Sequence, residues 1–400
     1  MVTRNCQHST MRICLATDTF LPEINGVTTV LAQMRDGLRA RGHEVRVLAP
    51  SYGALTGDES GVLRLRAVPA PGYPQVRLSW PWARGLTGVV DRFGPDVVHA
   101  VTEGPLGLFG RGYASRRQIP LATSFHTDFP RYAAHYLGRF AVRPTRAYLR
   151  WFHNAAALTQ TPSELSRDEL LTMGVPRATV WGRGVDTAWF RPERRSPARR
   201  ALMGVEGDRV LALHVGRLAV EKGVETLVAA FTEARARLGN RAVFCVAGDG
   251  PRAAWVRSAM PWARHLGFLE RDVLADLYAD ADLFVFPSAT ETCGLVALEA
   301  LASGVPVIGA NAGGVRESLR NGLTGVLVTA GVAGEFAAAI EQLVLDGEHR
   351  RAMHEAARAF AVGRDWAREL DQLEGVYQSL CSTSRAVVAP SIWPTITSVR

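Results

Sequence analysis

Two glutamates, Glu291 and Glu299, are separated by seven residues, a spacing that suggests a binding or catalytic site. They flank the expected junction between a buried strand and a helix that begins near Gly294. The first amides of such a helix, on Gly294, Leu295 and Val296, would face a cleft and suit a diphosphate. Glu299 could then accept hydrogen bonds from ribose hydroxyls, and Glu291 could reach a sugar. The spacing alone leaves open that both are capping or solvated glutamates.

Lys222 is the only lysine in a chain with 46 basic residues. It lies in the segment VGRLAVEKG (215–223), which also holds Arg217 and directly follows another expected strand. Lysine is a compact point charge, whereas arginine is a larger planar fork, so a tight phosphate site can accept one and exclude the other. Chance placement of the last lysine is the alternative, but the position favours phosphate binding.

Two further candidates lie at strand ends in the first half of the chain. Gly26 stands between the first strand and the first helix, where glycine lets the backbone approach a phosphate or sugar. A glycine at such a place is also often only part of a turn. His126 ends the strand LATSF, although a lone histidine is more often structural than functional. Asp18 and Asp128 are weaker cleft candidates.

The elements that must position these residues alternate between strands and helices. In the first half, strands are expected at 12–17, 44–49, 96–101 and 119–125, and a helix at 27–41. After a polar, charge-dense segment at 190–209, typical of a linker, the pattern restarts. Strands are then expected at 210–215, 242–247, 282–286 and 305–308, and helices at 223–238 and 294–303. This pattern predicts an α/β protein with two doubly wound parallel sheets, whose ligands bind at the carboxyl ends of strands.

The length of 400 residues fits two domains. We expect a Rossmann-like N-terminal domain at 11–189 and a second domain at 200–365. A last amphipathic helix at 366–380 is expected to pack back on the first domain, and a Ser-, Thr- and Pro-rich tail at 381–400 is expected to be disordered. The first ten residues lack the apolar core of a secretory signal, and Met11 stays open as the true start.

The composition excludes several classes of protein. With 47% hydrophobic and 21% charged residues the chain is globular, and it has no run of about 18 uncharged apolar residues that could span a membrane. Its five cysteines have neither metal-ligand nor redox spacing, and an odd number argues against a disulfide framework. A reducing cytosol fits this pattern best.

The basic charge belongs to the first half of the chain. Residues 1–190 hold 22 arginines and 14 acidic residues, a net charge of +8, whereas the remaining residues balance at 24 of each sign. Nucleic acid or a phospholipid surface could be the anionic partner, and no nucleic-acid motif appears. We therefore expect no nucleic acid partner.

Four arginines in the basic half, Arg139, Arg143, Arg146 and Arg150, fall on one stripe of an expected helix. With neighbouring aromatic residues, such a helix could lie on an anionic membrane surface. Pro144 argues for a helix start or kink that weakens the stripe. A solvated helix face stays open as the alternative.

The motifs together resemble glycosyltransferase family 4, whose members are retaining enzymes with the two-domain GT-B fold. Matching segments run in order along nearly the whole chain. They are FLPEINGV (20–27), SFHTD (124–128), TPS (161–163), GVD (184–186), VGRLAVEKG, AGDGP (247–251), FPS (286–288), ETCGLVALEALASGVPVI (291–308) and GGVRE (313–317). Bacterial phospholipid mannosyltransferases and sulfolipid synthases are the members that the chain most resembles.

The resemblance implies a role for each candidate. Glu291 and His126 would be catalytic and lie at the transferred sugar. The donor would be bound by Gly26, Arg217, Lys222, Gly294, Leu295, Val296 and Glu299. It also implies a nucleotide-sugar donor, with GDP-mannose preferred, and a lipid or glycan acceptor. UDP-sugars, a soluble acceptor, a silent nucleotide-sugar-binding protein and a pyridoxal phosphate-dependent phosphorylase stay open as alternatives.

Neither a metal nor a cofactor is expected. Asp280 and Asp282 match a DxD metal motif of a different glycosyltransferase fold, but here they end an expected helix and open a buried strand, which favours a structural role. The expected location is the cytoplasm, with peripheral attachment to the inner face of the cell membrane left open.

Overall fold

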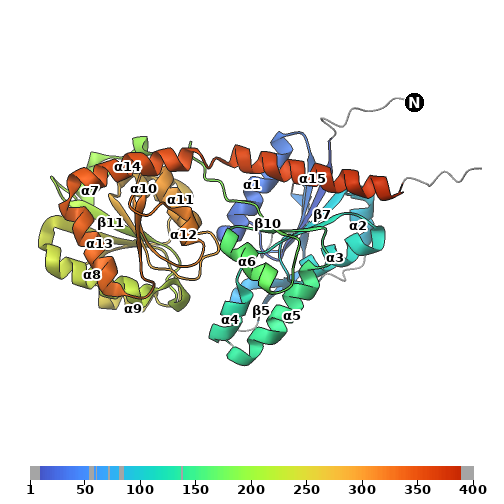
Figure 1. Ribbon diagram of the computed structural model, residues 1–400, viewed down its shortest axis with the longest axis horizontal. Helices are drawn as coiled ribbons and strands as arrows, with labels where there is room; N and C mark the ends of the chain where they lie inside the picture. Colours follow the sequence, from blue (N-terminus) through green and yellow to red (C-terminus); the bar gives the residue numbers. More distant parts are fainter. Residues whose placement is uncertain are drawn as a thin grey trace, which may run out of the picture.

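The computed structural model describes residues 10–53, 58–59, 61–70, 73–80, 85–136 and 138–388. Its chain forms two lobes that lie side by side, each built around a parallel β-sheet (Figure 1). Blue to green segments make up most of the first lobe, yellow to orange-red segments make up most of the second, and the last red helix lies on the first (Figure 1). The predicted α/β class, with two doubly wound sheets, is therefore confirmed.

The sheet of the first lobe has the strand order β10-β9-β8-β7-β1-β2-β4-β3 among the described residues, and a two-stranded ribbon, β5-β6, lies beside it. Its strands are β1 (Arg12–Ala16), β2 (Glu44–Pro50), β3 (Asp58–Glu59), β4 (Val62–Leu65), β5 (Ala67–Ala70), β6 (Tyr73–Ser79), β7 (Val97–Ala100), β8 (Leu121–Ser124), β9 (Leu158–Thr161) and β10 (Ala178–Val180). The helices are α1 (Gly26–Ala40), α2 (Leu86–Phe93), α3 (Pro105–Arg117), α4 (Phe129–Tyr136), the 3-10 turn η1 (Arg139–Ala141), α5 (Val142–His153) and α6 (Glu164–Thr172).

The sheet of the second lobe has the order β13-β12-β11-β14-β15-β16, with parallel pairing between neighbours. Its strands are β11 (Val210–Val215), β12 (Ala242–Ala247), β13 (Arg264–Gly267), β14 (Leu283–Phe286), β15 (Val307–Ala310) and β16 (Gly325–Val328). The helices are η2 (Pro192–Arg194), α7 (Pro197–Leu202), η3 (Val220–Lys222), α8 (Val224–Leu238), η4 (Gly239–Arg241), α9 (Ala253–Ala259), α10 (Arg271–Asp280), α11 (Leu295–Ala302), α12 (Val315–Ser318), α13 (Ala333–Leu345) and α14 (Gly347–Val362). The last helix, α15 (Trp366–Val388), packs on the first lobe.

Both sheets are covered on two faces, as near-continuous apolar strands require. In the second lobe, alternate residues of β11 point to opposite sides: Ala212 packs with α8 and α13, and Leu213 packs with α10 and α11. In the first lobe, Leu15 of β1 packs with α1 and α15, and Ala16 packs with α2 and α3. In sheets of this kind, the loops at the carboxyl ends of the strands usually carry the functional residues.

The final helix joins the lobes. The chain returns from α14 on the second lobe to α15, which lies along the first lobe beside α1 (Figure 1). Within the first core, the Tyr377 hydroxyl lies 2.6 Å from Nδ1 of His99. Near the crossing, the Val185 amide donates to the Arg364 carbonyl at 2.9 Å. The chain therefore passes between the lobes along two adjacent segments that are hydrogen-bonded to each other.

The helix expected at 366–380 is longer than the sequence predicts. It continues to Val388, so a tail that starts at Cys381 is wrong for its first residues. The apolar residues Leu370, Leu373 and Tyr377 keep one face of the helix on the first core, and the following residues extend the same helix. The rest of the expected tail, residues 389–400, and residues 1–9 lie outside the described residues.

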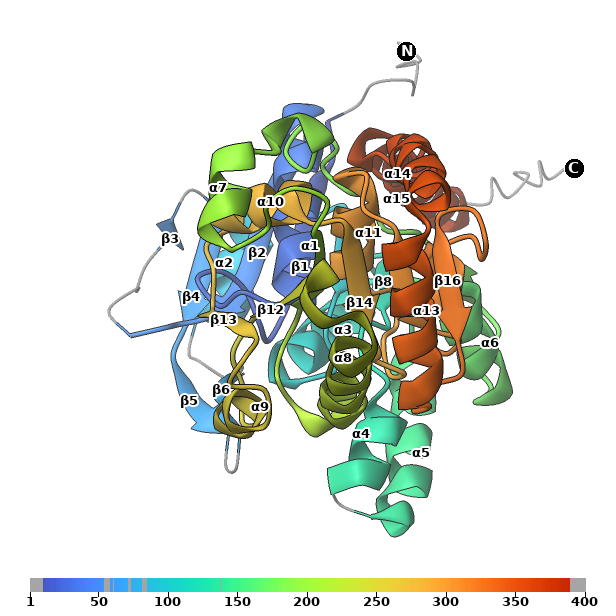
Figure 2. The same ribbon diagram turned by 90° about the vertical axis from the view of Figure 1, so that its left-hand side faces the viewer.

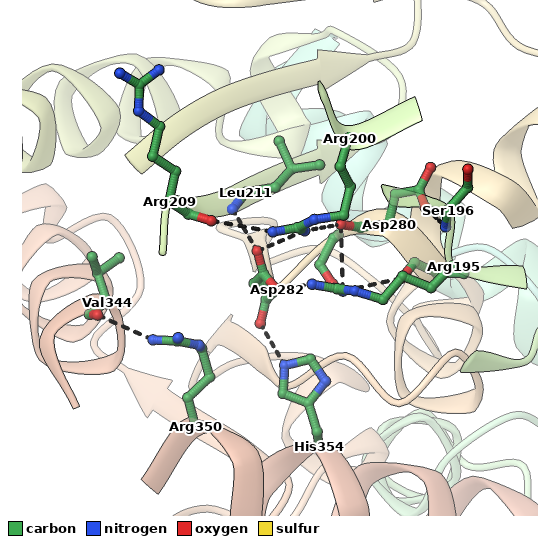
Figure 3. A network of polar contacts seen from close by, with 12 residues as sticks. Arg195, Ser196, Arg200, Arg209, Leu211, Asp280, Asp282, Val344, Arg350 and His354 are labelled. Carbon is green, nitrogen blue, oxygen red and sulfur yellow. Dashed lines mark hydrogen bonds and ion pairs between the residues drawn. The ribbon is translucent and has the colours of Figure 1, made fainter. Parts of the chain in front are cut away.

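The segment 190–209 is not a loose linker, because η2 and α7 fold against the second lobe. Nε of Arg199 lies 2.7 Å from Asp280, and Nη1 of Arg200 lies 2.9 Å from Asp282. Asp282 also pairs with Arg195 and accepts the Leu211 amide (Figure 3). The high charge density that suggested a solvated linker instead holds this segment in place, and Asp280 and Asp282 have structural partners.

The charged form of Asp282 should stabilise the second lobe. Burial alone would raise its pKa, but Arg195, the Leu211 amide and Arg200 outweigh burial and lower the pKa below 3.8. Because the folded pKa is lowered, this stabilisation is present above the unfolded pKa and is lost as the pH falls through the folded pKa.

We expect Asp282→Asn to lower the free energy of unfolding by about 3 kcal/mol at neutral pH, because Arg195 and Arg200 lose a buried counter-charge. Urea unfolding monitored by tryptophan fluorescence would measure this loss. Asp276→Asn is the matched control, since Asp276 pairs with Arg194 and Arg199 at a more exposed position and should cost less than about 1 kcal/mol. Equal losses of unfolding free energy in both variants would contradict the structural role of the Asp282 ion pairs.

Candidate functional site

Lys222 and Glu291 form an ion pair at the carboxyl edge of the second sheet. Lys222 ends η3, after β11, and Glu291 lies in the loop after β14. Their Nζ and Oε1 atoms are 2.6 Å apart, and the Ser288 hydroxyl donates to the same Oε1 at 2.9 Å. The structure thus brings together the unique lysine and the first glutamate of the predicted pair.

The segment that carries Arg217 is held by the AGDGP loop after β12. The Leu218 amide donates to the Asp249 carbonyl at 2.9 Å, and the Arg252 amide donates to the Leu218 carbonyl at 2.9 Å. Gly248 has a φ of +132°, and a Cβ there would lie 1.9 Å from the Gly216 carbonyl oxygen. Glycine is therefore required for the two loops to approach each other.

The loop that carries Glu291 is held in a similar way by Gly314. The Gly314 amide donates to the Glu291 carbonyl at 2.7 Å. A Cβ on Gly314 would lie 2.2 Å from the Thr292 carbonyl oxygen. The pair G313-G314 in the sequence therefore marks a packing position that shapes the site.

The N-terminus of α11 meets the N-terminus of α1 from the other lobe. Gly294 precedes α11 with a φ of +77°, and no side chain among the described residues caps this helix end. Leu295 and Val296 form its first turn and are partly buried. Across the boundary between the lobes, a Cβ on Gly26 would lie 3.7 Å from Cδ1 of Leu295. The predicted donor residues from both halves of the chain thus lie together.

Glu299 faces a different part of the site from Glu291. It lies one turn along α11, near Tyr278 and Arg271 of α10. Burial raises the pKa of Glu299 to about 7, and the Tyr278 hydroxyl and Arg271 charge act in the opposite direction. Glu299 therefore lies toward α10, whereas Glu291 is paired with Lys222.

His126 follows β8 of the first lobe and contacts the Glu291 loop. Its carbonyl accepts a hydrogen bond from the Thr292 hydroxyl at 2.8 Å. Its Nδ1 lies 3.1 Å from Nη2 of Arg183. Burial, followed by the charges of Arg183 and His99, lowers the pKa of His126 well below 6.5, so its ring is neutral at pH 7.

Arg183 and Thr292 were missed by the sequence analysis. Thr292 stands between two recognised motif positions, Glu291 and Gly294, but a threonine in a loop has no distinctive pattern. Arg183 directly precedes the recognised segment GVD (184–186). What distinguishes Arg183 is its burial beside the crossing between the lobes, and the sequence alone does not show burial.

A groove of about 550 Å³ runs between the lobes beside the Lys222 loop. From the first lobe it is lined by Arg131, Ala134 and Arg139, and from the second by residues that include Glu221, Thr226 and Thr290. Another hollow, of about 430 Å³, lies over α7 and contains no predicted site residue. The groove beside Lys222 is the one that adjoins the predicted chemistry.

The predicted arginine stripe is not a single helical face. Arg139 lies in η1 and lines the groove, whereas α5 begins at Val142, since Pro144 fits only the first turn of a helix. Arg146 donates to the Thr172 hydroxyl at 3.3 Å. Arg143 and Arg150 are exposed on α5, which projects with α4 from the first lobe (Figures 1 and 2).

Two weaker cleft candidates have structural partners. Asp18 accepts the Leu106 amide at 2.9 Å and the Thr102 hydroxyl at 2.7 Å, so it caps the start of α3. Asp128 accepts the Arg131 amide at 3.0 Å at the start of α4. Both carboxylates are therefore occupied in holding the loops of the first lobe.

Metal-binding clusters and membrane-spanning helices can be assessed only in the described part of the chain. There, no three His, Cys, Asp or Glu side chains are grouped so that they could hold a metal ion. None of the described helices is both long enough and apolar enough to cross a membrane.

Comparison with known proteins gives matches to both lobes. Residues 24–189 match the model of Glycosyltransferase Family 4, and residues 198–360 match that of Glycosyl transferases group 1. A GDP-mannose-dependent alpha-mannosyltransferase of Mycobacterium tuberculosis is 34% identical, with 92% of this chain and 97% of that protein covered. An alpha-monoglucosyldiacylglycerol synthase of Acholeplasma laidlawii is 30% identical, with 74% of this chain and 80% of that protein covered.

A solved structure supports the fold independently. Anabaena HepE in complex with UDP and glucose has a TM-score of 0.73 at 22% identity, over 93% of this chain and 100% of that chain. The family matches to both halves of the chain agree with the two parallel-sheet lobes. They also agree with the pairing of Lys222 and Glu291 at the carboxyl edge of the second sheet. The chain belongs to glycosyltransferase family 4 and is a glycosyltransferase with the GT-B fold.

Proposed function

We propose that this enzyme transfers α-mannose from GDP-mannose to a lipid or glycolipid acceptor, with retention of the anomeric configuration. The observation that carries the proposal is the Lys222–Glu291 pair at the uncapped start of α11, opposite His126 of the other lobe. The choice of GDP-mannose is supported by the name of the Mycobacterium tuberculosis relative. A lipid acceptor is supported by the name of the diacylglycerol-glucosylating relative.

In this proposal the donor lies across the second lobe. Glu299 accepts hydrogen bonds from the ribose hydroxyls, and the diphosphate lies at Lys222, Arg217 and the first amides of α11. Binding of the diphosphate to Lys222 would compete with Glu291 for the ammonium group. Glu291 would then turn toward the sugar, where it and His126 orient the hydroxyls.

The chemical step breaks the bond between the anomeric carbon and the diphosphate oxygen. Lys222, Arg217 and the helix amides stabilise the negative charge that develops on the leaving diphosphate. The acceptor hydroxyl oxygen bonds to the same face of the anomeric carbon, and its proton passes to an oxygen of the departing phosphate. This route gives retention without a carboxylate nucleophile.

The groove beside Lys222 is the proposed route for the acceptor. Arg131 and Arg139 line it from the first lobe, which also holds the excess positive charge of the chain. UDP-sugars remain the alternative donors, because Arg271 and the surrounding loop carry no evident code for the base.

Direct assay of transfer tests the proposal. The purified chain would be incubated with radiolabelled GDP-mannose and bacterial lipid extract, and labelled glycolipid would be separated by thin-layer chromatography. A thermal-shift series with GDP, UDP, ADP and their sugars reports donor choice, because a ligand that binds only the folded state raises the melting temperature. A larger shift with UDP-sugars, and transfer from them alone, would replace the GDP-mannose proposal.

Lys222→Arg should lose most of the turnover although its charge is retained. The space beside Glu291 and Ser288 accommodates a compact ammonium, whereas a planar guanidinium would place its donors elsewhere. Steady-state kinetics would measure the loss. Arg252→Lys is the control, because Arg252 forms an exposed pair with Glu225 in the same lobe. Turnover of Lys222→Arg close to that of the wild type would contradict the phosphate role.

Substitution of the two glutamates should separate binding from chemistry. Glu299→Ala should mainly weaken GDP binding, because the ribose contact does not change during the reaction. Glu291→Ala should mainly lower kcat, because the sugar develops charge in the transition state. The comparison is best made at pH 8, where a carboxyl with a pKa of about 7 is mostly ionised. An equal increase of KM in both variants with unchanged kcat would make the assigned roles wrong.

Activity should not require a divalent metal. The diphosphate charge would be met by Lys222, Arg217 and the α11 amides, so excess EDTA should leave the rate of transfer unchanged. The rate would be measured before and after chelation, with magnesium or manganese added back. Loss in EDTA and recovery with either metal would show that a cation takes part in donor binding.

The exposed arginines should promote reversible attachment to anionic vesicles. Arg139, Arg143 and Arg150 are exposed, and three cations near the bilayer would contribute about 3 kcal/mol. Sedimentation with anionic vesicles should carry the protein down at low salt and release it at 1 M salt, where the Debye length is about 3 Å. Neutral vesicles should not bind it.

The triple change of these arginines to Gln should reduce sedimentation. Arg146→Gln is the matched control, because Arg146 lies against Thr172 and should contribute little. Wild-type protein that stays in the supernatant with anionic vesicles at low salt would favour a soluble acceptor.

A further inference from the structure

We propose that Arg183 is a positioning residue that keeps the His126 proton on Nε2 and presents this N–H to the transferred sugar. This inference rests on the proposed function, because that function places a transferred sugar at His126. The state of the ring follows from contacts within the chain. It can therefore be tested whether or not the donor is GDP-mannose.

The contact between the two side chains determines which ring nitrogen carries the proton. Nη2 of Arg183 lies 3.1 Å from Nδ1 of His126. A guanidinium has donors only, so Nδ1 must accept the hydrogen bond through its lone pair. A neutral imidazole has a single proton, and it must then lie on Nε2.

The guanidinium of Arg183 is itself fixed. Its Nη1 donates to the carbonyls of Trp181 and Gly182 at 2.9 and 3.1 Å, and its carbon lies 4.8 Å from the Trp181 ring centroid. Arg183 is 3% exposed, so water has little access to compete for these hydrogen bonds. The donor to His126 is therefore held in one place before any substrate arrives.

The backbone of Arg183 is anchored by the final helix. A Cβ on Gly184 would lie 2.6 Å from Cα of Trp366, so this segment packs directly on the start of α15. The adjacent Val185 amide is bonded to Arg364. Arg183 thus extends from the crossing between the lobes to the ring of His126.

The other ring nitrogen is left for a ligand. Nε2 of His126 is buried and has no hydrogen-bond partner within the described part of the chain. Buried polar groups are usually hydrogen-bonded, so an unsatisfied N–H at a site indicates a missing partner. The His126 carbonyl is held by Thr292, next to Glu291. A donor N–H and an acceptor carboxylate from opposite lobes match the hydroxyl groups of a sugar.

The charges near the ring favour its neutral form. Arg183 and His99 are the groups whose charges act on His126, and both oppose a positive charge on it. Burial lowers the pKa of Arg183 to about 10, although the charges of Cys293 and Glu369 raise it. Arg183 is therefore protonated at pH 7. Arg183 therefore donates to a neutral ring across the physiological range.

Nitrogen-15 NMR of the full chain, labelled at histidine, would show the tautomer directly. His126 would be assigned by comparison with His126→Gln. We expect wild-type His126 to show a protonated Nε2 and an unprotonated Nδ1, without titration between pH 8 and pH 6. Arg183→Met should give a mixture of the two tautomers, because no donor then fixes Nδ1 as an acceptor. A wild-type ring protonated at Nδ1, or charged at pH 7, would overturn the proposal.

Kinetics with GDP-mannose would test the consequence for the reaction. Arg183→Met should lower kcat by about tenfold or more, as is common when a partner that orients a functional ring is removed. The affinity for GDP, which lacks the sugar, should change by less than about twofold. Arg183→Lys keeps a charged donor of similar length and should partly restore both kcat and the single tautomer. Unchanged kcat and tautomer in Arg183→Met would overturn the proposal.

Arg358→Met separates positioning from a general effect on the crossing. Arg358 donates to the carbonyls of Phe190, Ala302 and Thr187 near the same crossing, but it does not contact His126. Its loss should leave the His126 tautomer unchanged. A change equal to that in Arg183→Met would assign Arg183 a structural role only. If wild type neither binds GDP nor uses GDP-mannose, the proposed function fails, while the NMR result still decides the tautomer.

Discussion

The ion pair between Lys222 and Glu291 is the contact on which the arrangement of the site depends. It joins the loops after β11 and β14, two neighbouring strands whose carboxyl ends lie at the same edge of the second sheet. Each loop is shaped by backbone packing that only glycine permits, at Gly248 on one side and Gly314 on the other. The side chains of Lys222 and Glu291 are 21% and 17% exposed, so the pair is partly accessible to solvent, and in the proposed function a diphosphate could exchange with the carboxylate.

The second constraint is the way in which the lobes are joined. Two crossing segments lie side by side, and α15 buries its apolar face on the first core rather than on the second. The same crossing carries Arg183 to His126, and the carbonyl of His126 reaches the loop of Glu291 through Thr292. The contacts that hold the lobes together are thus continuous with the contacts that hold His126 and the Glu291 loop, where the transferred sugar is proposed to lie.

Much of the fold could be predicted from the sequence, because long apolar strands alternate with helices in a regular order. β11 and β12 have the predicted bounds, and α8 begins one residue later than predicted. The charged segment that holds η2 and α7 was misread as a linker, since composition cannot show that Arg195 and Arg200 face Asp282. The site residues Lys222 and Glu291 were recognisable from motifs. Arg183 was not, because its importance lies in burial and a contact across 57 residues of sequence.

The two glutamates of α11 and its preceding loop illustrate how environment separates residues of the same type. Glu291 is paired with a cation and a hydroxyl, whereas Glu299 lies partly buried near Tyr278, and desolvation raises its pKa to about 7. A carboxylate that is already held by Lys222 can reorient when a diphosphate takes its place, while one enclosed between α10 and α11 stays where it is. This difference supports the proposed roles, in which Glu299 contacts the ribose, which does not change during the reaction, and Glu291 contacts the sugar that reacts.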